Sequence, residues 1–217
     1  MTSTGKEAVV LGATGLVGRA AVAQLLADPS VSRVTTIVRR PSEVRDPRLI
    51  ERVVDFEQTE SWAPWVRGAL LFSALGTTIK TAGSKAAQYR VDHDYQLRAA
   101  EAARQNGVET CVLVSAQSSN PKSPVFYSRM KGELEEQVRA LDFPRLRILR
   151  PGLLDGEREE KCAGEKLSLA VLRHVPAWPS LASLRPIRVE DVARAGLRAA
   201  ADPRPGTWIL EARELFE

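Results

Sequence analysis

Val9-Val10-Leu11-Gly12-Ala13-Thr14-Gly15-Leu16-Val17-Gly18-Arg19 joins a short apolar run to three glycines at the spacing Gly-x-x-Gly-x-x-Gly, and a helical pattern follows. In a strand-to-helix turn of this kind, Gly12 permits the tight bend, Gly15 lets a pyrophosphate approach the backbone, and Gly18 lets the helix pack closely on the sheet. The stretch therefore predicts a dinucleotide-binding turn with the phosphates at the helix N-terminus. An ordinary strand-to-helix turn is the alternative.

Apolar runs and helical patterns alternate along the chain, which is typical of an α/β protein with a parallel sheet. We expect a Rossmann-like, doubly wound parallel sheet with helices on both faces and a small C-terminal substrate-side region. The whole chain, 1–217, is expected to form a single NAD(P)-binding domain, with approximately 152–217 as the substrate-side cap. The expected strands cover 7–11, 31–38, 51–54, 69–73, 110–114, 146–149, 187–189 and 207–210, the expected helices cover 16–27, 84–105, 127–141, 166–172 and 190–201, and 79–83 is expected to be a loop.

The composition indicates a soluble globular protein, with 44% hydrophobic and 27% charged residues. The 31 basic and 27 acidic residues are spread along the chain, so the net charge of +4 describes a solvated surface and argues against a nucleic-acid partner. No apolar run approaches the roughly 20 residues of a membrane span, and we expect no signal peptide. Because the two cysteines and two histidines form no cluster, we expect no metal site and a reduced, cytoplasmic protein.

Arg39 and Arg40 stand directly after the expected strand 31–38. In a parallel βαβ unit this strand end lies beside the adenosine ribose, where an acidic residue would bind a 2′-hydroxyl and an arginine would pair with a 2′-phosphate. Arg19, after the third glycine, is expected to face the same region. The arginines therefore favour NADP(H) over NAD(H) as the cofactor, and the alternative is that all three are surface charges.

Ser115 follows the expected strand 110–114, and Tyr127 and Lys131 lie in the first turns of the expected helix 127–141. A spacing of four residues places Tyr127 and Lys131 on one helical face, one turn apart. An ammonium within reach of a phenol lowers the pKa of the phenol from its usual value of about 10, so Tyr127 becomes a usable general acid or base. Such a pair also arises by chance, and the glycine turn together with Ser115 is what favours a catalytic group.

Other strand ends are also expected to face the cofactor. Asp55 is predicted to accept a hydrogen bond from the adenine amino group with the Phe56 ring beside the base, and the alternative is that Asp55 only caps a turn. The small residues after strand 69–73 let the backbone pass close to the cofactor. The expected cofactor-binding residues are Gly12, Thr14, Gly15, Leu16, Val17, Gly18, Arg19, Arg39, Arg40, Asp55, Phe56, Ala74, Leu75, Gly76, Thr77, Ser115, Tyr127, Lys131, Pro151, Gly152 and Leu153.

With the glycine turn, Ser115, Tyr127 and Lys131 in this order, the chain resembles the short-chain dehydrogenase/reductase superfamily in its extended or atypical branch. The resemblance implies bound NADP(H) and hydride transfer to or from a small carbonyl or alcohol substrate. It implies that Ser115 holds the carbonyl oxygen, Tyr127 donates or accepts its proton, and Lys131 tunes Tyr127 and hydrogen-bonds the nicotinamide ribose. A narrower similarity to the Tat-interacting-protein-like oxidoreductases lies in segments 76–85, 91–95, 131–135 and 150–156.

One position departs from the pattern of the extended members. Many of them carry Val-Asn on the long helix, where this sequence has Val91-Asp92, and this puts the usual proton relay in question. Two other functions use the same glycine turn. One is a redox-sensing regulatory protein that binds NADP(H) and acts through a protein partner with little or no turnover. The other is sugar-nucleotide epimerisation or dehydration, which normally needs a larger C-terminal domain than the residues after Gly156 provide.

Overall fold

The computed structural model describes residues 5–155 and 186–216 of the chain. In this part of the protein, seven parallel strands form one sheet in the order β3-β2-β1-β4-β5-β6-β9, and β7 pairs with β8 in a second, two-stranded sheet. The order reverses between β1 and β4, as in a doubly wound Rossmann-like fold, and this confirms the predicted fold class. The strands are β1 (Lys6–Leu11), β2 (Val31–Val38), β3 (Leu49–Val53), β4 (Leu70–Ser73), β5 (Thr110–Val114), β6 (Arg145–Arg150), β7 (Leu154–Asp155), β8 (Ile187–Arg188) and β9 (Gly206–Glu211).

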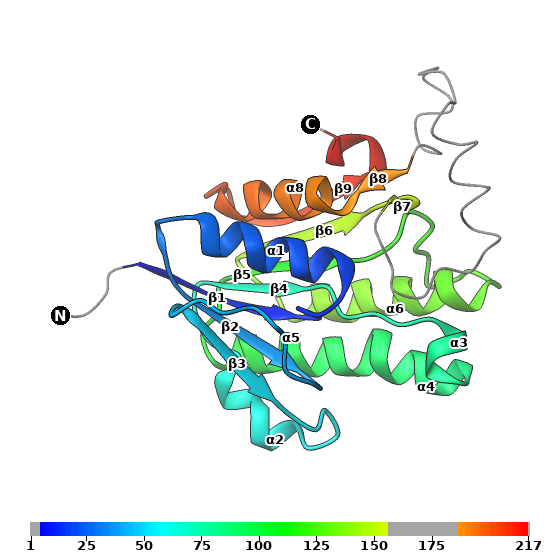
Figure 1. The fold of residues 1–217 in the computed structure, drawn as a ribbon. Coiled ribbons are helices and arrows are strands. Elements are labelled where there is room, and N and C mark those ends of the chain that lie inside the picture. The colour runs from blue at the N-terminus through cyan, green and yellow to red at the C-terminus, as the bar shows by residue number, and fades with distance from the viewer. Residues whose placement is uncertain (1–4, 156–185, 217) are drawn as a thin grey trace.

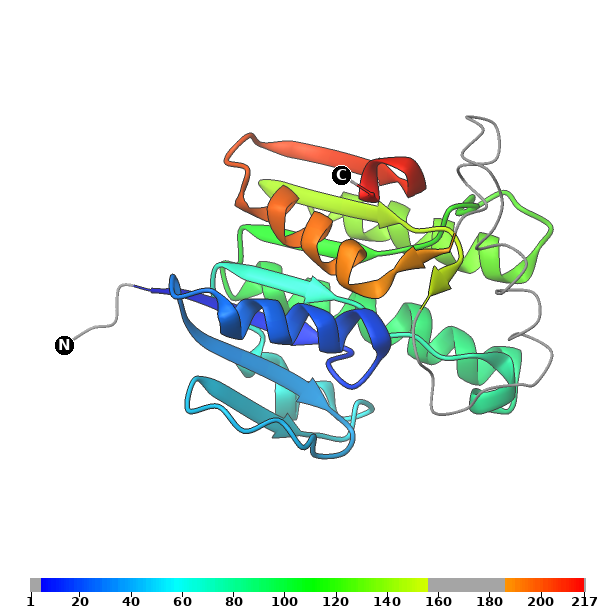
Figure 2. The ribbon, with the colours of Figure 1, turned by 45° about the horizontal axis from the view of Figure 1, so that its top comes forward.

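Helices cover both faces of the main sheet (Figure 1). Helix α1 (Leu16–Ala27) packs beside α8 (Val189–Ala201) on one face, where Figure 2 shows the two lying over the strands. Helices α5 (Tyr95–Gln105) and α6 (Phe126–Ala140) cover the other face. The shorter elements are α2 (Thr59–Trp62), α3 (Ile79–Ala82), α4 (Lys85–Tyr89), the π-helical turn η2 (Arg90–Asp94), and the 3-10 turns η1 (Ala63–Trp65) and η4 (Ala212–Leu215).

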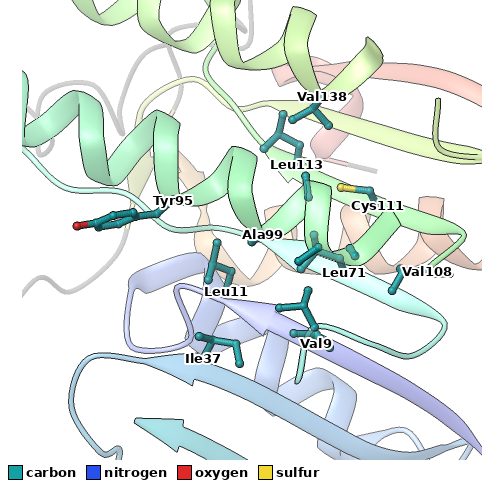
Figure 3. Packing of buried hydrophobic residues seen from close by; sticks show 14 of the residues in the cluster. Val9, Leu11, Ile37, Leu71, Tyr95, Ala99, Val108, Cys111, Leu113 and Val138 are labelled. Carbon is teal, nitrogen blue, oxygen red and sulfur yellow. The ribbon is translucent and has the colours of Figure 1, made fainter. Parts of the chain in front are cut away.

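Buried side chains alternate between the two faces of the sheet, because successive residues of a strand point in opposite directions. In β1, Val9 and Leu11 belong to the hydrophobic cluster on the α5 and α6 side, whereas Val10 belongs to the cluster on the α1 and α8 side. Figure 3 shows the first cluster, which also contains Cys111 and Leu113 of β5. Burial raises the pKa of the Cys111 thiol to about 12, so this thiol is a core side chain and not a nucleophile.

The predicted bounds of β2, β5 and α1 agree with the structure, and two other expectations do not. The expected loop 79–83 contains the helical turn α3, because the Thr78 hydroxyl accepts a hydrogen bond from the Thr81 N–H (3.1 Å) and Gly83, with φ of 87°, ends the turn. The expected continuous helix 84–105 is interrupted by η2. Strand β3 covers Leu49–Val53 instead of the expected 51–54, and the bounds of β1, β4, β6, β8 and β9 differ from the expected ones by one residue at one or both ends.

The expected substrate-side region, 152–217, is divided between different parts of the molecule. Helix α8 packs against α1, and β9 extends the main sheet beside β6, so both are elements of the main layers. The short strands β7 and β8 pair through Leu154 and Ile187. Residues 156–185, which include the expected helix 166–172, lie outside the described residues.

Arg147 is a fully buried charge in the middle of β6, and it connects the end of α8 to the start of β9. Its Nε donates to the carbonyl of Ala199 (2.9 Å), its Nη1 to that of Gly206 (2.8 Å), and its Nη2 to that of Arg204 (2.6 Å). Backbone carbonyls at helix ends and turns lack regular partners, so a buried arginine here satisfies several of them at once. We infer that Arg147 holds the last strand against the sheet.

We expect Arg147→Met to lower the free energy of unfolding by about 3 kcal/mol or more, because several buried carbonyls lose their donor. Urea unfolding followed by circular dichroism measures this change. The matched control is Arg145→Met on the same strand, which removes a surface pair with Glu109 (3.1 Å) and should cost about 1 kcal/mol or less. Equal losses in the two variants would contradict the assigned role of Arg147.

Candidate functional site

The glycine turn, residues 12–18, leaves no room for side chains at two of its three glycines. Gly12 has φ of 80°, and a Cβ there would lie 2.5 Å from the carbonyl carbon of Ala74. A Cβ on Gly18 would lie 2.1 Å from the carbonyl oxygen of Gly12. The turn is therefore pressed against the end of β4 on one side and against α1 on the other, as the sequence predicted for the first and third glycines.

The N-terminus of α1 carries backbone donors that no side chain caps. Gly15 is the N-cap residue, makes no side-chain cap hydrogen bond and precedes a first turn without acidic residues. The first N–H groups of a helix have no acceptor within the helix, and together with the helix dipole they attract an anion. Thr14 and Gly15 are exposed, Leu16 is half-buried and Val17 is buried. This donor set fits the pyrophosphate of a dinucleotide.

The end of β4 lies directly beside the glycine turn. The Ala74 N–H donates to the carbonyl of Leu11 (2.9 Å), which keeps the two strand ends together. The chain then passes through Leu75 and Gly76 to Thr77, whose N–H donates to Asp92 Oδ1 (2.6 Å). The predicted stretch 74–77 is therefore fixed at the carboxyl edge of the sheet, where ligands bind in open α/β folds.

Of the residues predicted for the adenosine side of the site, some lie at the surface and one lies in the core. Arg19, Arg39 and Arg40 are exposed, with Arg39 and Arg40 directly after β2. Asp55 Oδ1 accepts a hydrogen bond from the Glu57 N–H (3.0 Å), so Asp55 caps a turn. The ring of Phe56, by contrast, does not lie at the surface beside a base. It is 3% exposed, stacks on the ring of Tyr95 at a centroid distance of 5.1 Å and meets the tilted ring of Trp62 at 5.6 Å, because burial of an aromatic ring in the core is favourable.

Ser115 lies at the end of β5 as predicted, but its hydroxyl contacts another side chain of the protein. The residue is 5% exposed, and its Oγ donates to Glu135 Oε1 at 2.5 Å. A serine hydroxyl has one proton to donate. In this arrangement the hydroxyl proton of Ser115 makes a hydrogen bond to Glu135. The predicted contact with a carbonyl oxygen would require the same proton.

Glu135 is the centre of a buried charge network on α6. It is 2% exposed, and Arg150 at the end of β6 binds it with two hydrogen bonds, Nε to Oε1 at 3.0 Å and Nη2 to Oε2 at 2.7 Å. Arg150 also donates to Glu211 Oε1 (3.0 Å) from the neighbouring strand. The hydrogen bonds to Glu135 are the main cause that raises the pKa of Arg150. The ends of β5, β6 and β9 are joined through these side chains.

Tyr127 and Lys131 lie on one face of α6, as the four-residue spacing predicted. Tyr127 is 40% exposed, whereas Lys131 is 4% exposed. Next to Lys131, Gly132 lets the loop before the helix cross it, since a Cβ there would lie 2.2 Å from the backbone nitrogen of Pro121. The Tyr127 side chain is therefore accessible, whereas the Lys131 side chain is buried.

Lys131 lies close to Asp92 of η2. Burial lowers the pKa of Lys131, while the carboxylates of Asp92 and Glu135 act in the opposite direction. Burial likewise raises the pKa of Asp92, which is 1% exposed, and the Lys131 ammonium and the Thr77 N–H oppose this shift. Asp92 thus contacts the loop after β4 through the Thr77 N–H.

The turn after β6 completes the carboxyl edge. The carbonyl of Pro151 accepts a hydrogen bond from the Gln117 N–H (3.0 Å), and the Ser115 N–H donates to the carbonyl of Leu149 (2.8 Å). These bonds place the predicted residues Pro151, Gly152 and Leu153 beside the loop that follows β5. Leu153 is 45% exposed.

Other kinds of site find no support in the described structure. Among residues 5–155 and 186–216, no group of three or more His, Cys, Asp or Glu side chains is arranged to hold a metal ion. Within the same residues, no helix has the length and apolar character that crossing a membrane requires.

The geometry of the carboxyl edge agrees with the comparison to known families. Residues 12–203 match the model of a family described as NAD(P)H-binding. The chain belongs to this NAD(P)H-binding family. The match begins at Gly12 and includes the strands, helices and loops that form the candidate site. It confirms the predicted membership in an NAD(P)-binding family.

Curated relatives match most of the chain. Protein FMP52-1, mitochondrial, of Scheffersomyces stipitis is 37% identical over 222 residues, which cover 97% of each chain. Protein fmp52, mitochondrial, of Emericella nidulans is 40% identical over 166 residues, or 73% of this chain and 71% of the relative. The names of both relatives contradict the prediction of a cytoplasmic protein, because they call these proteins mitochondrial.

Solved structures of similar fold are those of nucleotide-dependent enzymes. The Bordetella bronchiseptica enzyme WbmH in complex with NAD⁺ superposes with a TM-score of 0.73 and 15% identity, covering 95% of this chain and 76% of that one. UDP-glucose 4-epimerase from Thermotoga maritima gives a TM-score of 0.70 and 15% identity, with 94% and 75% covered. At this identity the likeness shows a common fold.

The sequence prediction missed Glu135, Arg150 and Gly132. Glu135 follows Lys131 at the same four-residue spacing, and this is the signal that could have placed it on the same helical face as Tyr127 and Lys131. Arg150 ends β6, a largely buried strand, so its charge required a partner. Gly132 permits a close approach to Pro121 in the loop before the helix. No local sequence pattern indicates this contact.

We expect Ser115→Ala to lower the free energy of unfolding by about 1–2 kcal/mol, because buried Glu135 loses a donor. The control is Ser118→Ala, an exposed serine of the following loop, which should change stability by about 0.5 kcal/mol or less. Urea unfolding of both variants measures the difference. Identical stabilities would show that the bond from Ser115 to Glu135 is not a stabilising contact.

Proposed function

We propose that the protein is an NADP(H)-dependent oxidoreductase that transfers hydride to or from a small carbonyl or alcohol substrate. One observation carries the proposal: the glycine turn, the loop after β4 and the helix with Tyr127 and Lys131 meet at one edge of the sheet, on either side of the reversal in strand order. A cofactor bound along this edge would have its phosphates at α1 and its nicotinamide near Tyr127. The cofactor supplies the hydride, and the protein supplies binding, orientation and proton transfer.

The preference for NADP(H) rests on Arg39, Arg40 and Arg19. Arg39 and Arg40 follow β2, the strand beside β1, so they lie on the side where the adenosine ribose of a dinucleotide is expected. Their guanidinium groups suit a 2′-phosphate, which accepts paired hydrogen bonds. The NAD⁺ named in the WbmH complex supports a dinucleotide on this fold and not the choice between the two forms.

Proton transfer is assigned to Tyr127. Tyr127 is 40% exposed, and Lys131 follows it one helical turn further along α6, a spacing that supports an ammonium near the phenol. Because a nearby positive charge favours the phenolate, Tyr127 exchanges a proton with the substrate oxygen more readily than an isolated tyrosine. To donate to the substrate oxygen, the Ser115 hydroxyl would have to give up its hydrogen bond to Glu135. The second function compatible with the same cofactor site is that of a regulatory protein that binds NADP(H) and acts through a protein partner.

We expect NADPH to bind more tightly than NADH, and Arg39→Ala and Arg40→Ala to weaken NADPH binding about tenfold or more, because each removes a donor to the 2′-phosphate. NADH affinity should change little, since NADH lacks that phosphate. Nucleotide fluorescence titration measures both. Arg33→Ala is the control, because Arg33 of β2 pairs with Glu7 (3.2 Å). Equal affinities for the two nucleotides in the unmodified protein would overturn the proposed specificity.

We expect Tyr127→Phe to lower NADPH-dependent turnover about 100-fold or more while NADPH affinity is retained, because the phenol proton acts in the chemical step. The measurement is NADPH oxidation over a panel of aldehydes and ketones. Tyr89→Phe is the control: its hydroxyl donates to Glu133 (3.0 Å), and burial is the main cause that raises its pKa to about 12. Full turnover in Tyr127→Phe would contradict the catalytic role. NADPH binding without turnover on any substrate would favour the regulatory function.

A further inference from the structure

The loop that joins β2 to β3, residues 39–48, is fixed to the sheet at both of its ends. β2 and β3 lie side by side at one edge of the sheet (Figure 2). At the first end of the loop, the carbonyl of Val38 accepts a hydrogen bond from the Val54 N–H (2.9 Å). At the second end, Arg48 Nη1 donates to the carbonyl of Val31 (3.2 Å) at the start of β2. The loop therefore leaves the sheet and returns to it at defined points.

A third fixed point lies within the loop, at Ser42. The Ser42 N–H donates to both carboxylate oxygens of Glu51, at 2.9 and 3.0 Å, and the Ser42 carbonyl accepts from Arg45 Nη1 (3.0 Å). Glu51 is half-buried in β3, where it pairs in register with Thr36 of β2. A hydrogen bond to an ionised acceptor is stronger than one between neutral groups. Glu51 therefore ties the middle of the loop to the sheet.

Apolar packing contributes little to holding the loop against β3. An open hollow of about 490 Å³ is lined by residues 44–47 of the loop and by Leu49 and Glu51 of the strand. Val44 in this segment is 38% exposed. Because the side chains do not fill the space between loop and strand, few dispersion contacts join them. The hydrogen bonds from Ser42 to Glu51 are therefore the main attachment of this part of the loop.

The two arginines proposed for the 2′-phosphate lie between two of these fixed points. Residues 39–41, with the sequence Arg-Arg-Pro, are the whole connection between Val38 and Ser42. The ring of Pro41 fixes its own φ at about −65° and disfavours helical backbone at Arg40. The segment is thus held at both ends and stiffened in the middle, so its arginines have a narrow range of positions before a ligand binds. Such preorganisation lowers the entropic cost of binding.

We propose that Glu51 is a positioning residue for the 2′-phosphate of NADP(H). By holding Ser42 it fixes Arg39 and Arg40, and this sets the preference for NADP(H) over NAD(H). The inference rests on the proposed function, in which the two arginines bind this phosphate. It also reverses the expectation from charge alone. A carboxylate near the arginines repels a phosphate, so its removal by itself would strengthen NADPH binding, whereas loss of the anchor weakens it.

The first test compares Glu51→Met with Glu51→Gln by nucleotide fluorescence titration with NADPH and NADH. Both new side chains are uncharged and similar in length to glutamate, but only glutamine keeps an oxygen that accepts the Ser42 N–H. We expect NADPH binding to weaken about fivefold or more in Glu51→Met and to be retained or strengthened in Glu51→Gln. NADH affinity should stay constant in both variants, because NADH has no 2′-phosphate. Equal NADPH affinities in the two variants, or an equal loss of NADPH and NADH binding in Glu51→Met, would overturn the proposal.

Glu43→Met is the matched control for the change in charge. Glu43 is exposed in the same loop, and its substitution removes one negative charge, as that of Glu51 does. The affinity for NADPH should not fall in this variant, since the hydrogen bonds of Ser42 are retained. A loss equal to that in Glu51→Met would contradict the role of the Glu51 anchor.

Amide hydrogen exchange of the cofactor-free protein tests the anchor without a nucleotide. In the unmodified protein the Ser42 amide should exchange about tenfold or more slowly than the amide of exposed Glu43, because a hydrogen-bonded N–H is protected. This protection should be lost in Glu51→Met and kept in Glu51→Gln. Equal exchange of the two amides in the unmodified protein would overturn the inference even if a variant does not fold.

The titrations also separate this inference from the proposed function. If the unmodified protein binds NADPH no more tightly than NADH, the proposed cofactor preference fails and the inference fails with it. If the unmodified protein prefers NADPH and Glu51→Met keeps the same preference, the proposed function stands and only the inference fails.

Discussion

The close approach of helix α1 to the backbone at the end of β1 is the constraint on which the site depends. A Cβ on Gly18 would lie 2.1 Å from the Gly12 carbonyl oxygen, and a Cβ on Gly12 would lie 2.5 Å from the backbone of Ala74. Glycine at these positions lets the helix begin directly at the carboxyl edge of the sheet. Its uncapped N–H groups then lie beside the strand end of β4, where the order of the strands reverses.

Buried charges organise the other half of the carboxyl edge. Tyr127, Lys131 and Glu135 follow one another at intervals of one helical turn on α6, and each charged member lies near an opposite charge from another element. Asp92 of η2 lies near Lys131, and Arg150 of β6 binds Glu135. Removing one partner of a buried pair leaves the other uncompensated, so such networks fix the relative positions of the elements that carry them.

The fold itself does not select the reaction. Enzymes such as UDP-glucose 4-epimerase share the arrangement of strands and helices at 15% identity, and many functions use such sheets. The carboxyl edge of this chain carries the arginines after β2, an aspartate in the π-helical turn, and a serine whose hydroxyl donates to Glu135.

The sequence by itself determined the features that depend on local spacing. The glycine turn, the apolar run of β1 and the placing of Tyr127 and Lys131 on one helical face follow from local spacing and from the period of the helix. The tertiary structure decided the features that depend on contacts between distant segments. The ring of Phe56 lies in the core, and the Ser115 hydroxyl donates a hydrogen bond to Glu135. Both outcomes depend on which side chains meet across elements far apart in the chain, and burial makes those contacts outweigh local preference.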